Sequence, residues 1–379
     1  MIYFDSAATT LQKPETVPAA VAEAIRTMTT PGRGDYPAAH LAADRMLALR
    51  TEAAEYFGVS DPERVILTAN ATHGLNLAIK SLVSPGDTVV ISGYEHNAVT
   101  RPLHAIGGVS VRIVNGRLFD PDQMAEGFDR AVGGGVKAVV CTHVSNVFGY
   151  ALPMDDISAV CRRKGVPLIV DASQSAGVLP VDLKKWGAAY VAMPGHKGLY
   201  GPQGTGLLLC GEEQPAPLLY GGTGSESQNQ TMPDVLPDRL EAGTQNVSGA
   251  AGLLAGLRFV RCKGVDRIGA YEECLSGQLM DGLEQVPGVR VFRGPKGTQT
   301  GVCSITVEGM DCEEVGSWLA RRGIAVRAGL HCAPLAHKTA GTLDTGTVRL
   351  SCSAFNTSQQ VRRAAGAIAH LARCQGKGR

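Results

Sequence analysis

Lys197 is the residue whose type and surroundings point most directly to chemistry. It lies in the segment Pro194-Gly195-His196-Lys197-Gly198, just after an apolar run at 188–193 that is typical of a buried strand. Glycine and proline turns hold such a lysine in one place, and burial or a nearby cation lowers the pKa of its amine and makes it nucleophilic. An exposed lysine in a glycine-rich loop is the alternative interpretation.

A carboxylate precedes this lysine in a second strand-like segment. The apolar run at 167–170 ends in Asp171, and Gln174 follows three residues later. An aspartate that keeps a pyridine nitrogen protonated and a lysine that carries the aldehyde are the groups that pyridoxal 5'-phosphate (PLP) needs from a protein. Taken together, Lys197, Asp171 and Gln174 predict a PLP site.

Small and hydroxyl residues suited to a phosphate follow another predicted strand, at 65–68. Ala71 and Thr72 open an amphipathic helix there, and the backbone N–H groups at a helix N-terminus bind phosphate well. A simple capping role for Thr72 is the alternative and is compatible with phosphate binding. The small residues at 5–10, which include Ala8, could let the backbone approach a ligand, or they could form an ordinary N-terminal arm.

Two further predicted strands also end in polar side chains. His96 follows the run at 88–92, where an imidazole can lie over a pyridine ring and move protons, although a structural histidine is an equal alternative. Asn146 follows the run at 137–142 and could hydrogen-bond a cofactor oxygen or a substrate group. His143 is a weaker candidate, and a core position would explain it.

The last cluster contains a possible nucleophile. Cys332 follows Arg327 and His331 closely, and positive charge nearby lowers the pKa of a thiol and makes it reactive. Arg349 lies on a short predicted strand and could grip a carboxylate through two hydrogen bonds. A buried structural cysteine is the alternative. A metal site of His331, Cys332 and His337 lacks a further ligand at a familiar spacing, so no metal is predicted.

Composition limits the class of protein. The chain has 379 residues, of which 44% are hydrophobic and 19% charged, with a formal net charge of +1. This balance predicts a large soluble core and argues against nucleic acid or a membrane surface as a partner. We find no signal peptide or transmembrane run, and the ten cysteines form no C-x-x-C pair. A cytoplasmic protein with reduced thiols is therefore expected.

Apolar runs and helical patterns alternate through the first two thirds of the chain. Such alternation predicts a mainly parallel sheet with helices on both faces and with sites at the carboxyl ends of the strands. The expected strands are 65–68, 88–92, 110–114, 137–142, 167–171, 190–193 and 205–210, with helices at 14–28, 38–57, 97–106, 121–131 and 155–164.

A polar segment at 218–239, rich in Gly, Ser, Gln and Pro, interrupts this alternation and is interpreted as a functional loop or a subunit contact. Beyond it, helices at 246–261 and 266–285 lead to a smaller α+β domain. We expect that domain to contain strands at 289–292, 302–307, 324–327 and 347–351, with helices at 312–322 and 358–373.

The combined motifs resemble those of the class V aminotransferase family of PLP fold type I, and within it the cysteine desulfurases. The resemblance covers nearly the whole chain. Its strongest parts are Asp171-x-x-Gln174, Gly195-His196-Lys197, Arg327-Ala328-Gly329-x-His331-Cys332 and Arg349-Leu350-Ser351. It implies a large PLP-binding domain at 14–255 with a mainly parallel seven-stranded sheet, and a small domain formed by 1–13 and 256–379.

The resemblance also assigns roles. Lys197 would hold PLP covalently, Asp171 would pair with the ring nitrogen, Gln174 would contact the ring oxygen and His96 would stack on the ring. The remaining cofactor-binding residues would be Ala71, Thr72, His196, Asn146 and, from a neighbouring subunit, Thr244 in the segment Glu241-Ala242-Gly243-Thr244, which implies a homodimer. The substrate-binding residues would be Arg349, Asn146, Ala8 and Arg327.

The implied reaction converts L-cysteine to L-alanine, with Lys197 moving the α-proton and Cys332 taking the sulfur as a persulfide. Arg349 follows Cys332 by 17 positions, a short spacing that resembles the group II enzymes, whose cysteine sits on a short structured loop, so a docking sulfur-acceptor protein is implied. The final destination of the sulfur (iron–sulfur clusters, thiolated tRNA or a cofactor) stays open.

Two positions depart from the pattern, because Pro194 replaces a hydroxyl residue that binds phosphate in the family, and Gly198 is an extra residue. Alternative functions are a selenocysteine lyase, an aminotransferase or epimerase of the same fold, and a non-catalytic scaffold in sulfur trafficking.

Overall fold

A computed structural model describes residues 1–32 and 34–376. Its centre is a seven-stranded sheet with the order β2-β8-β7-β6-β5-β3-β4. Only β8 runs antiparallel to its neighbours β2 and β7, so the predicted mainly parallel α/β sheet is confirmed. The strands are β2 Val65–Thr68, β3 Thr88–Ser92, β4 Ser110–Val114, β5 Val136–Thr142, β6 Leu168–Asp171, β7 Tyr190–Pro194 and β8 Gly206–Cys210.

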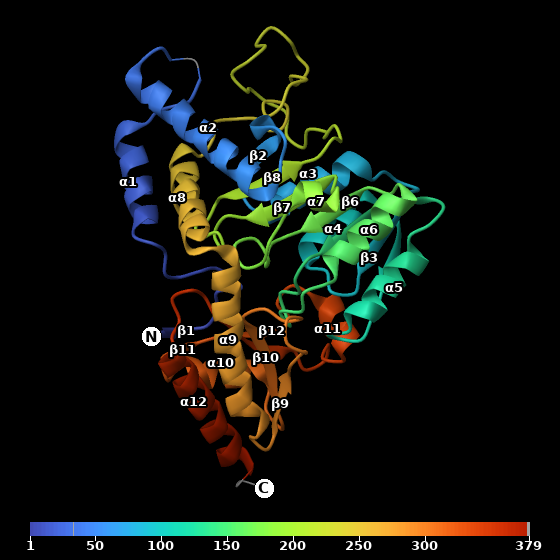
Figure 1. The fold of residues 1–379 in the computed structure, drawn as a ribbon, viewed down its shortest axis with the longest axis vertical. Helices are drawn as coiled ribbons and strands as arrows, with labels where there is room; N and C mark the ends of the chain where they lie inside the picture. The colour runs from blue at the N-terminus through green and yellow to red at the C-terminus, as the bar shows by residue number, and fades with distance from the viewer. Residues whose placement is uncertain (33, 377–379) are drawn as a thin grey trace.

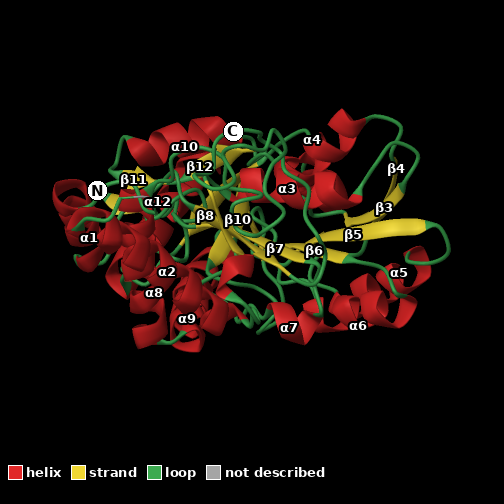
Figure 2. Ribbon diagram, turned by 90° about the horizontal axis from the view of Figure 1, so that it is seen from above, coloured by secondary structure: helices red, strands yellow, loops and turns green. Residues whose placement is uncertain are grey.

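Helices cover both faces of this sheet (Figure 2), as parallel strands with apolar side chains on both faces require. On one face lie α3 (Ala71–Leu82) and α4 (Asn97–Ile106), which share a hydrophobic core with β3 and β5. On the other lie α5 (Pro121–Ala131), α6 (Met154–Lys164) and α7 (Leu183–Trp186). The helix α2 (Pro37–Phe57) adds Leu49, Ala53 and Phe57 to this second core.

Two helices at one end of the sheet lead to a smaller lobe. The helix α8 (Val247–Lys263) packs against α2 and against α1 (Thr16–Thr27), and α9 (Val265–Glu284) continues from it toward the C-terminal lobe (Figure 1). A short 3-10 helix, η1 (Pro62–Arg64), precedes β2.

The smaller lobe contains a four-stranded antiparallel sheet with the order β12-β13-β10-β9. Its strands are β9 Val289–Phe292, β10 Val302–Val307, β12 Arg327–Gly329 and β13 Thr347–Ser351, and its helices are α10 Cys312–Ala320, α11 Pro334–Ala340 and α12 Ser358–Gly376. A separate core joins Ile2 and Phe4 of the N-terminal arm to this lobe. That grouping agrees with a small domain built from both chain ends, whose boundaries stay a prediction.

The structure differs from the sequence-based expectation in three elements. The strand expected at 324–327 is two strands, because β11 (Ile324–Ala325) pairs with β1 (Ile2–Tyr3) whereas β12 pairs with β13. The short helices α7 and α11 were not predicted. Within residues 1–32 and 34–376, no helix combines the length and the hydropathy needed to cross a bilayer.

Candidate active site

Lys197 lies in the turn that follows β7, at the carboxyl edge of the sheet. This turn packs closely against the turn that follows β6, because a Cβ atom at Gly198 would overlap the carbonyl of Ala176. Gly177 has a φ of +85°, and a Cβ atom there would overlap the carbonyl of Gly198. Gly198 therefore permits a backbone contact that joins the lysine turn to the turn that carries Gln174.

The N-terminal arm holds the lysine turn from the other side. The carbonyl oxygen of His196 accepts hydrogen bonds from the backbone N–H of Thr10 at 3.2 Å, from the Thr9 hydroxyl at 3.2 Å and from Lys13 Nζ at 2.9 Å. Desolvation lowers the pKa of Lys13 to about 8. Sequence reasoning missed Lys13, because nothing in the local pattern showed that the arm reaches the lysine turn.

The amine of Lys197 is prepared for nucleophilic chemistry. Burial lowers its pKa to about 8; Asp171 opposes that shift, while Arg349 and Arg327 add to it. The prediction of a lysine with lowered pKa agrees with these surroundings. The pKa of His196 is also lowered, to about 4, by burial and by Lys197 and Lys13, so its imidazole is neutral near pH 7.

Asp171 ends β6 and is 2% exposed. Its Oδ1 accepts a hydrogen bond from the backbone N–H of Ser173 at 2.9 Å, and its charge acts on both Lys197 and His96. Gln174 donates from Nε2 to the carbonyl of Ala7 at 2.9 Å. Ala8 lies in the same turn of the arm, where its N–H donates to the carbonyl of Asp5.

His96 caps the N-terminus of α4, since its Nδ1 accepts from the backbone N–H of Ala98 at 3.0 Å. That hydrogen bond leaves Nε2 as the protonated nitrogen, and burial lowers the pKa of the ring. Beside it, the fully buried Glu95 accepts from the Ser92 hydroxyl and from the backbone N–H of Thr142 at 2.8 Å. Burial first, and Asp171 in addition, raise the pKa of Glu95 to about 8, so this unpredicted residue is a neutral acid near pH 7.

The first turn of α3 departs from the expected capping. Asn70 caps it by accepting from the N–H of His73 at 2.9 Å, so the alternative that Thr72 caps the helix is wrong. Ala71 is buried and Thr72 is exposed. The Nε2 atom of His73 is buried without a hydrogen-bond partner. Sequence reasoning did not select His73.

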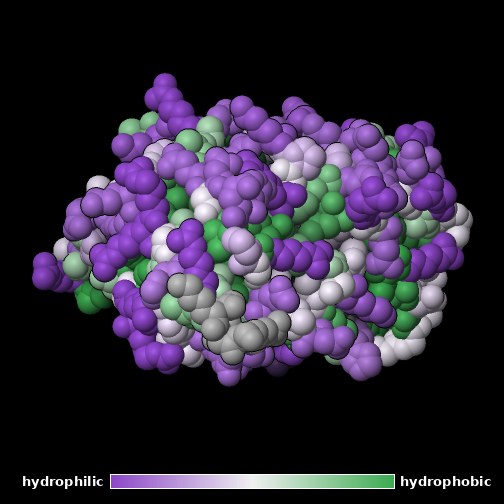
Figure 3. Space-filling model, turned by 90° about the horizontal axis from the view of Figure 1, so that it is seen from below, coloured by the Kyte–Doolittle hydropathy of each residue, from purple (hydrophilic) through white to green (hydrophobic). Residues whose placement is uncertain are grey.

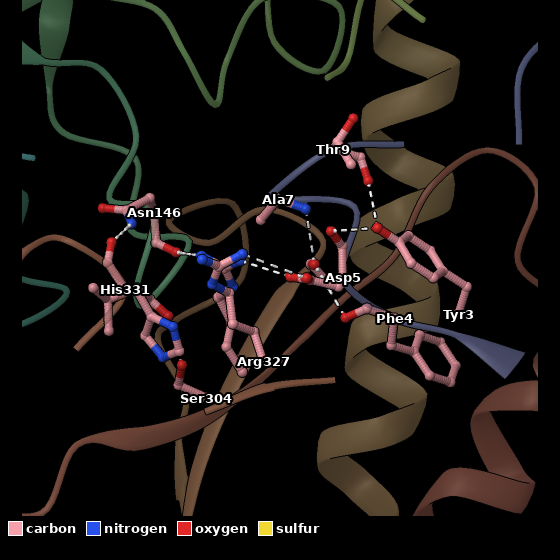
Figure 4. Close-up of polar contacts among 12 residues, drawn as sticks. Tyr3, Phe4, Asp5, Ala7, Thr9, Asn146, Ser304, Arg327 and His331 are labelled. Carbon is pink, nitrogen blue, oxygen red and sulfur yellow. Dashed lines mark hydrogen bonds and ion pairs between the residues drawn. The ribbon is translucent and has the colours of Figure 1, made fainter. Parts of the chain in front are cut away.

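Arg349 is 2% exposed and connects several segments. Its Nη1 donates to the carbonyl of Asn146 at 2.8 Å, and its Nη2 donates to Asp5 Oδ1 at 2.9 Å. Arg327, opposite Arg349 across β12 and β13, lies 3.7 Å from the other carboxylate oxygen of Asp5. Figure 4 shows Asp5 between Tyr3 and Arg327, with Asn146 and His331 on the far side. Sequence reasoning did not identify Asp5 as the counter-ion.

Cys332 is exposed on a turn that two hydrogen bonds fix in place. Its carbonyl accepts from the N–H of Asn97, the first residue of α4, at 2.8 Å, and the carbonyl of His331 accepts from Asn146 Nδ2 at 2.7 Å. His331 and Cys332 have φ values of +50° and +56°, an uncommon conformation for residues other than glycine. The thiol is therefore presented from a strained turn beside the helix that begins after His96.

The expected positive charge on His331 is absent. Burial and the neighbouring Arg349 lower the pKa of His331 to about 2, and its Nε2 lies 3.1 Å from the hydroxyl of Thr347. His337 has a pKa lowered to about 4, again mainly by burial. No group of three or more His, Cys, Asp or Glu side chains that could hold a metal ion occurs among the described residues.

The donor set fits PLP. A lysine amine that is half neutral near pH 8 suits an aldehyde, and a buried carboxylate at a neighbouring strand end suits a pyridinium nitrogen. Residues of the site also carry buried polar atoms without a partner, namely His196 Nδ1, His73 Nε2 and Arg349 Nε. Such atoms call for a ligand or water, because an unpaired buried polar group costs about 1–3 kcal/mol.

Comparison with known proteins identifies the family. The sequence profile of the family "Aminotransferase class-V" matches residues 2–364. The chain belongs to this family and, within it, to the cysteine desulfurases. These enzymes depend on PLP, so PLP is the cofactor.

Several similar proteins are named cysteine desulfurase or probable cysteine desulfurase. A cysteine desulfurase from Cronobacter sakazakii is 32% identical over 99% of this chain and 94% of its own length. A probable cysteine desulfurase from Mycolicibacterium paratuberculosis is 33% identical over 95% of this chain, which spans only 54% of that longer protein. The structure of a cysteine desulfurase from Thermococcus onnurineus superposes with a TM-score of 0.89 at 30% identity, covering 98% of this chain and 94% of its own.

The fold thus gathers most of the predicted site residues around Lys197. Asp171, Gln174, His96 and His196 end or follow strands at the same edge of the sheet. Asn146 hydrogen-bonds Arg349 and His331, the residue before Cys332, and Arg327 pairs with Arg349 across β12 and β13. Thr244 is exposed on the wall of a cavity beside Ala69 and His73. Its segment is fixed by a buried ion pair of 2.6 Å between Glu241 and Arg50, and Glu241 also accepts from the N–H of Leu67.

Proposed function

We propose that this protein is an L-cysteine desulfurase that converts L-cysteine to L-alanine and holds the sulfur as a persulfide on Cys332. The observation that carries the proposal is an exposed thiol on a turn that is hydrogen-bonded to α4 and to Asn146, in a chain whose Lys197 has a pKa lowered to about 8. The family membership of the chain supports it.

Each residue of the site has a task in this reaction. PLP would be held by Lys197, Asp171, Gln174, His96, Ala71, Thr72, His196, Asn146 and Thr244 of the partner subunit. When bound, PLP supplies the electron sink that stabilises negative charge at the substrate α-carbon. Arg349 binds the substrate carboxylate, with Arg327, Asn146 and Ala8 around it. The neutral Lys197 amine takes the α-proton at Nζ and later returns a proton to the substrate.

Sulfur transfer then depends on Cys332. Its thiolate attacks the substrate sulfur, so that an S–S bond forms while the C–S bond breaks with its electron pair left on carbon. That carbon takes up a proton, and L-alanine leaves. The neutral Nε2–H of His96 is a suitable donor or relay for this proton.

The structured cysteine turn favours transfer to a docked acceptor protein. Only seven residues of helix, α11, and two short connections separate Cys332 from β13, which is consistent with the group II resemblance. Leu330 and Leu343 are 38% and 43% exposed in this part of the chain and would offer an acceptor apolar contacts. We also propose that the protein forms a homodimer and supplies sulfur for iron–sulfur cluster assembly. Its ten free cysteines support a cytoplasmic location, which we propose as well.

The test is Cys332→Ala. The variant should keep the yellow colour of bound PLP but lose alanine formation from L-cysteine by at least about a hundredfold, because no thiol remains to take the sulfur. Cys274→Ala, which removes another exposed thiol, is the matched control and should stay active. Undiminished alanine formation by C332A would reject the role of Cys332. A preference for selenocysteine that survives in C332A would instead favour a selenocysteine lyase.

A further inference from the structure

The ion pair between Asp5 and Arg349 occupies a donor that a substrate carboxylate needs. A guanidinium group has five N–H donors, and in Arg349 one is used by the carbonyl of Asn146 and one by Asp5. Its Nε is buried and has no partner. A carboxylate that uses two parallel hydrogen bonds to the Nε and Nη2 edge therefore meets Asp5 at Nη2.

A second arginine, Arg327, lies near the Asp5 carboxylate. Arg327 Nη1 lies 3.7 Å from Asp5 Oδ2, and the Arg327 side chain is 48% exposed, whereas that of Arg349 is 2% exposed. The Asp5 carboxylate therefore lies between two arginines, the buried Arg349 and the exposed Arg327, whose side chain is free to adjust. The backbone of Asp5 is fixed by its bridge to Ser351, so only its side chain has to rotate.

We propose that Asp5 is an internal carboxylate that occupies Arg349 in the resting enzyme and passes to Arg327 when the substrate carboxylate binds. Asp5 then determines affinity and specificity, although it does not touch the reacting atoms. This inference rests on the proposed function for the assignment of Arg349 to the substrate carboxylate.

The charge balance gives Asp5 a role in specificity. Two guanidinium groups and Asp5 leave a net charge of +1, which one substrate carboxylate neutralises. A substrate with a second carboxylate, such as L-aspartate, would bring another negative charge into a site that already contains Asp5. Asp5 thus favours amino acids with a single carboxylate, a requirement that L-cysteine and L-alanine meet.

A purely positioning role makes the opposite prediction. If Asp5 mainly oriented Arg349, its removal would weaken carboxylate binding. However, Arg349 retains its hydrogen bond to Asn146 and its buried packing without Asp5. The sign of the change in affinity therefore separates the two roles.

The experiment compares Asp5→Asn with the native holoenzyme by calorimetric titration with L-alanine and L-aspartate. D5N should bind L-alanine about threefold to tenfold more tightly, equivalent to roughly 0.7–1.4 kcal/mol, and L-aspartate should gain more than L-alanine. Asp281→Asn, which opens a surface ion pair with Arg293, is the matched control and should change neither. Unchanged or weaker binding of L-alanine by D5N would overturn the proposal.

A double-mutant cycle adds an independent readout. Arg327→Gln should weaken L-alanine binding in the native background, because Asp5 then remains on Arg349, but should have little effect in the D5N background. An equal loss in both backgrounds would mean that Arg327 binds the ligand directly and would contradict the transfer of Asp5. These titrations need no turnover, so a failure of the desulfurase assay and a failure of this proposal are distinguishable.

Discussion

At the scale of single residues, the site is built by shifting the protonation of a few side chains. Burial makes Lys197 a neutral nucleophile near pH 8 and makes Glu95 a neutral acid near pH 7. The neutrality of Glu95 matters because a second ionised carboxyl group near Asp171 would repel it. In the proposed site, Asp171 would then be the carboxylate that pairs with the ring nitrogen of PLP.

The pKa of Lys197 predicts how the apoenzyme takes up its cofactor. Only the neutral amine attacks the aldehyde of PLP, and a pKa lowered from 10.5 to about 8 leaves about half of the amine neutral at pH 8. The rate of PLP uptake should therefore rise with pH and level off just above pH 8. Stopped-flow absorbance of the apoenzyme mixed with PLP at pH 6 to 10 measures this rate.

An uptake rate that keeps rising steadily to pH 10 would show an ordinary lysine and contradict this prediction. Lys197→Ala is the control, since it should bind PLP without the absorbance of a covalent adduct. Borohydride reduction of the native holoenzyme should attach the cofactor to the peptide that contains residue 197 and to no other.

At the scale of elements, Asn146 connects the cofactor edge of the sheet to the cysteine turn. Its side chain was expected to contact the cofactor or the substrate, but its Nδ2 donates to the carbonyl of His331. Asn146→Ala would leave that carbonyl without its donor at a cost of about 1–3 kcal/mol. We expect kcat to fall by at least about tenfold while PLP affinity changes much less, because the turn that presents Cys332 loses one of its two anchors.

Iodoacetamide labelling of Cys332 followed by mass spectrometry tests this directly. The labelling rate of Cys332 should change in N146A, while that of Cys274, a distant exposed thiol, should not. A variant that loses PLP affinity but labels Cys332 at the native rate would show that Asn146 acts on the cofactor alone.

The elements also show what could be predicted from the sequence. Strands such as β2, β3 and β4 were predicted with their observed bounds, because apolar runs between turn residues are a local signal. The division between β11 and β12 could not be predicted, since it depends on the pairing of Ile324 with Ile2 and of Arg327 with Arg349. Similarly, α11 spans too few residues for its periodicity to be distinguished.

The same distinction applies to the site. Lys197 and Asp171 were predicted because each follows an apolar strand and has a chemical type that PLP requires. Asp5 and Lys13 were missed as site residues, because their partners Arg349 and His196 lie far away in the sequence. Glu95 was missed because its significance comes from complete burial beside Asp171, which no local pattern reveals.

At the scale of the whole molecule, exposed apolar side chains are concentrated at the end formed by α2 and the segment 218–239. The segment 218–239 projects beside α2 at the end opposite the C-terminus (Figure 1). Large apolar side chains are exposed on this segment and on α2, namely Leu219, Tyr220, Val235, Leu41 and Leu47. The face seen from below is mostly hydrophilic, with separate hydrophobic areas (Figure 3). Exposed apolar groups that gather at one end are typical of a subunit interface.

The proposed homodimer predicts that one charge in this segment will dissociate the subunits and weaken the cofactor site. Tyr220 is 77% exposed in the single chain, so Tyr220→Asp should leave folding intact while placing a charge in the interface. We expect sedimentation velocity to show a dimer for the native protein and a monomer for Y220D. PLP affinity should fall with dissociation, because Thr244 of the partner subunit would no longer reach the phosphate.

Val111→Asp is the matched control, since Val111 is 38% exposed on the edge strand β4 outside this end of the molecule. V111D should remain a dimer with native PLP affinity. If Y220D and the native protein sediment alike, the segment 218–239 is not the interface. If Y220D is a monomer that binds PLP as tightly as the native protein, each subunit completes its own phosphate site and the role of Thr244 across the interface is wrong.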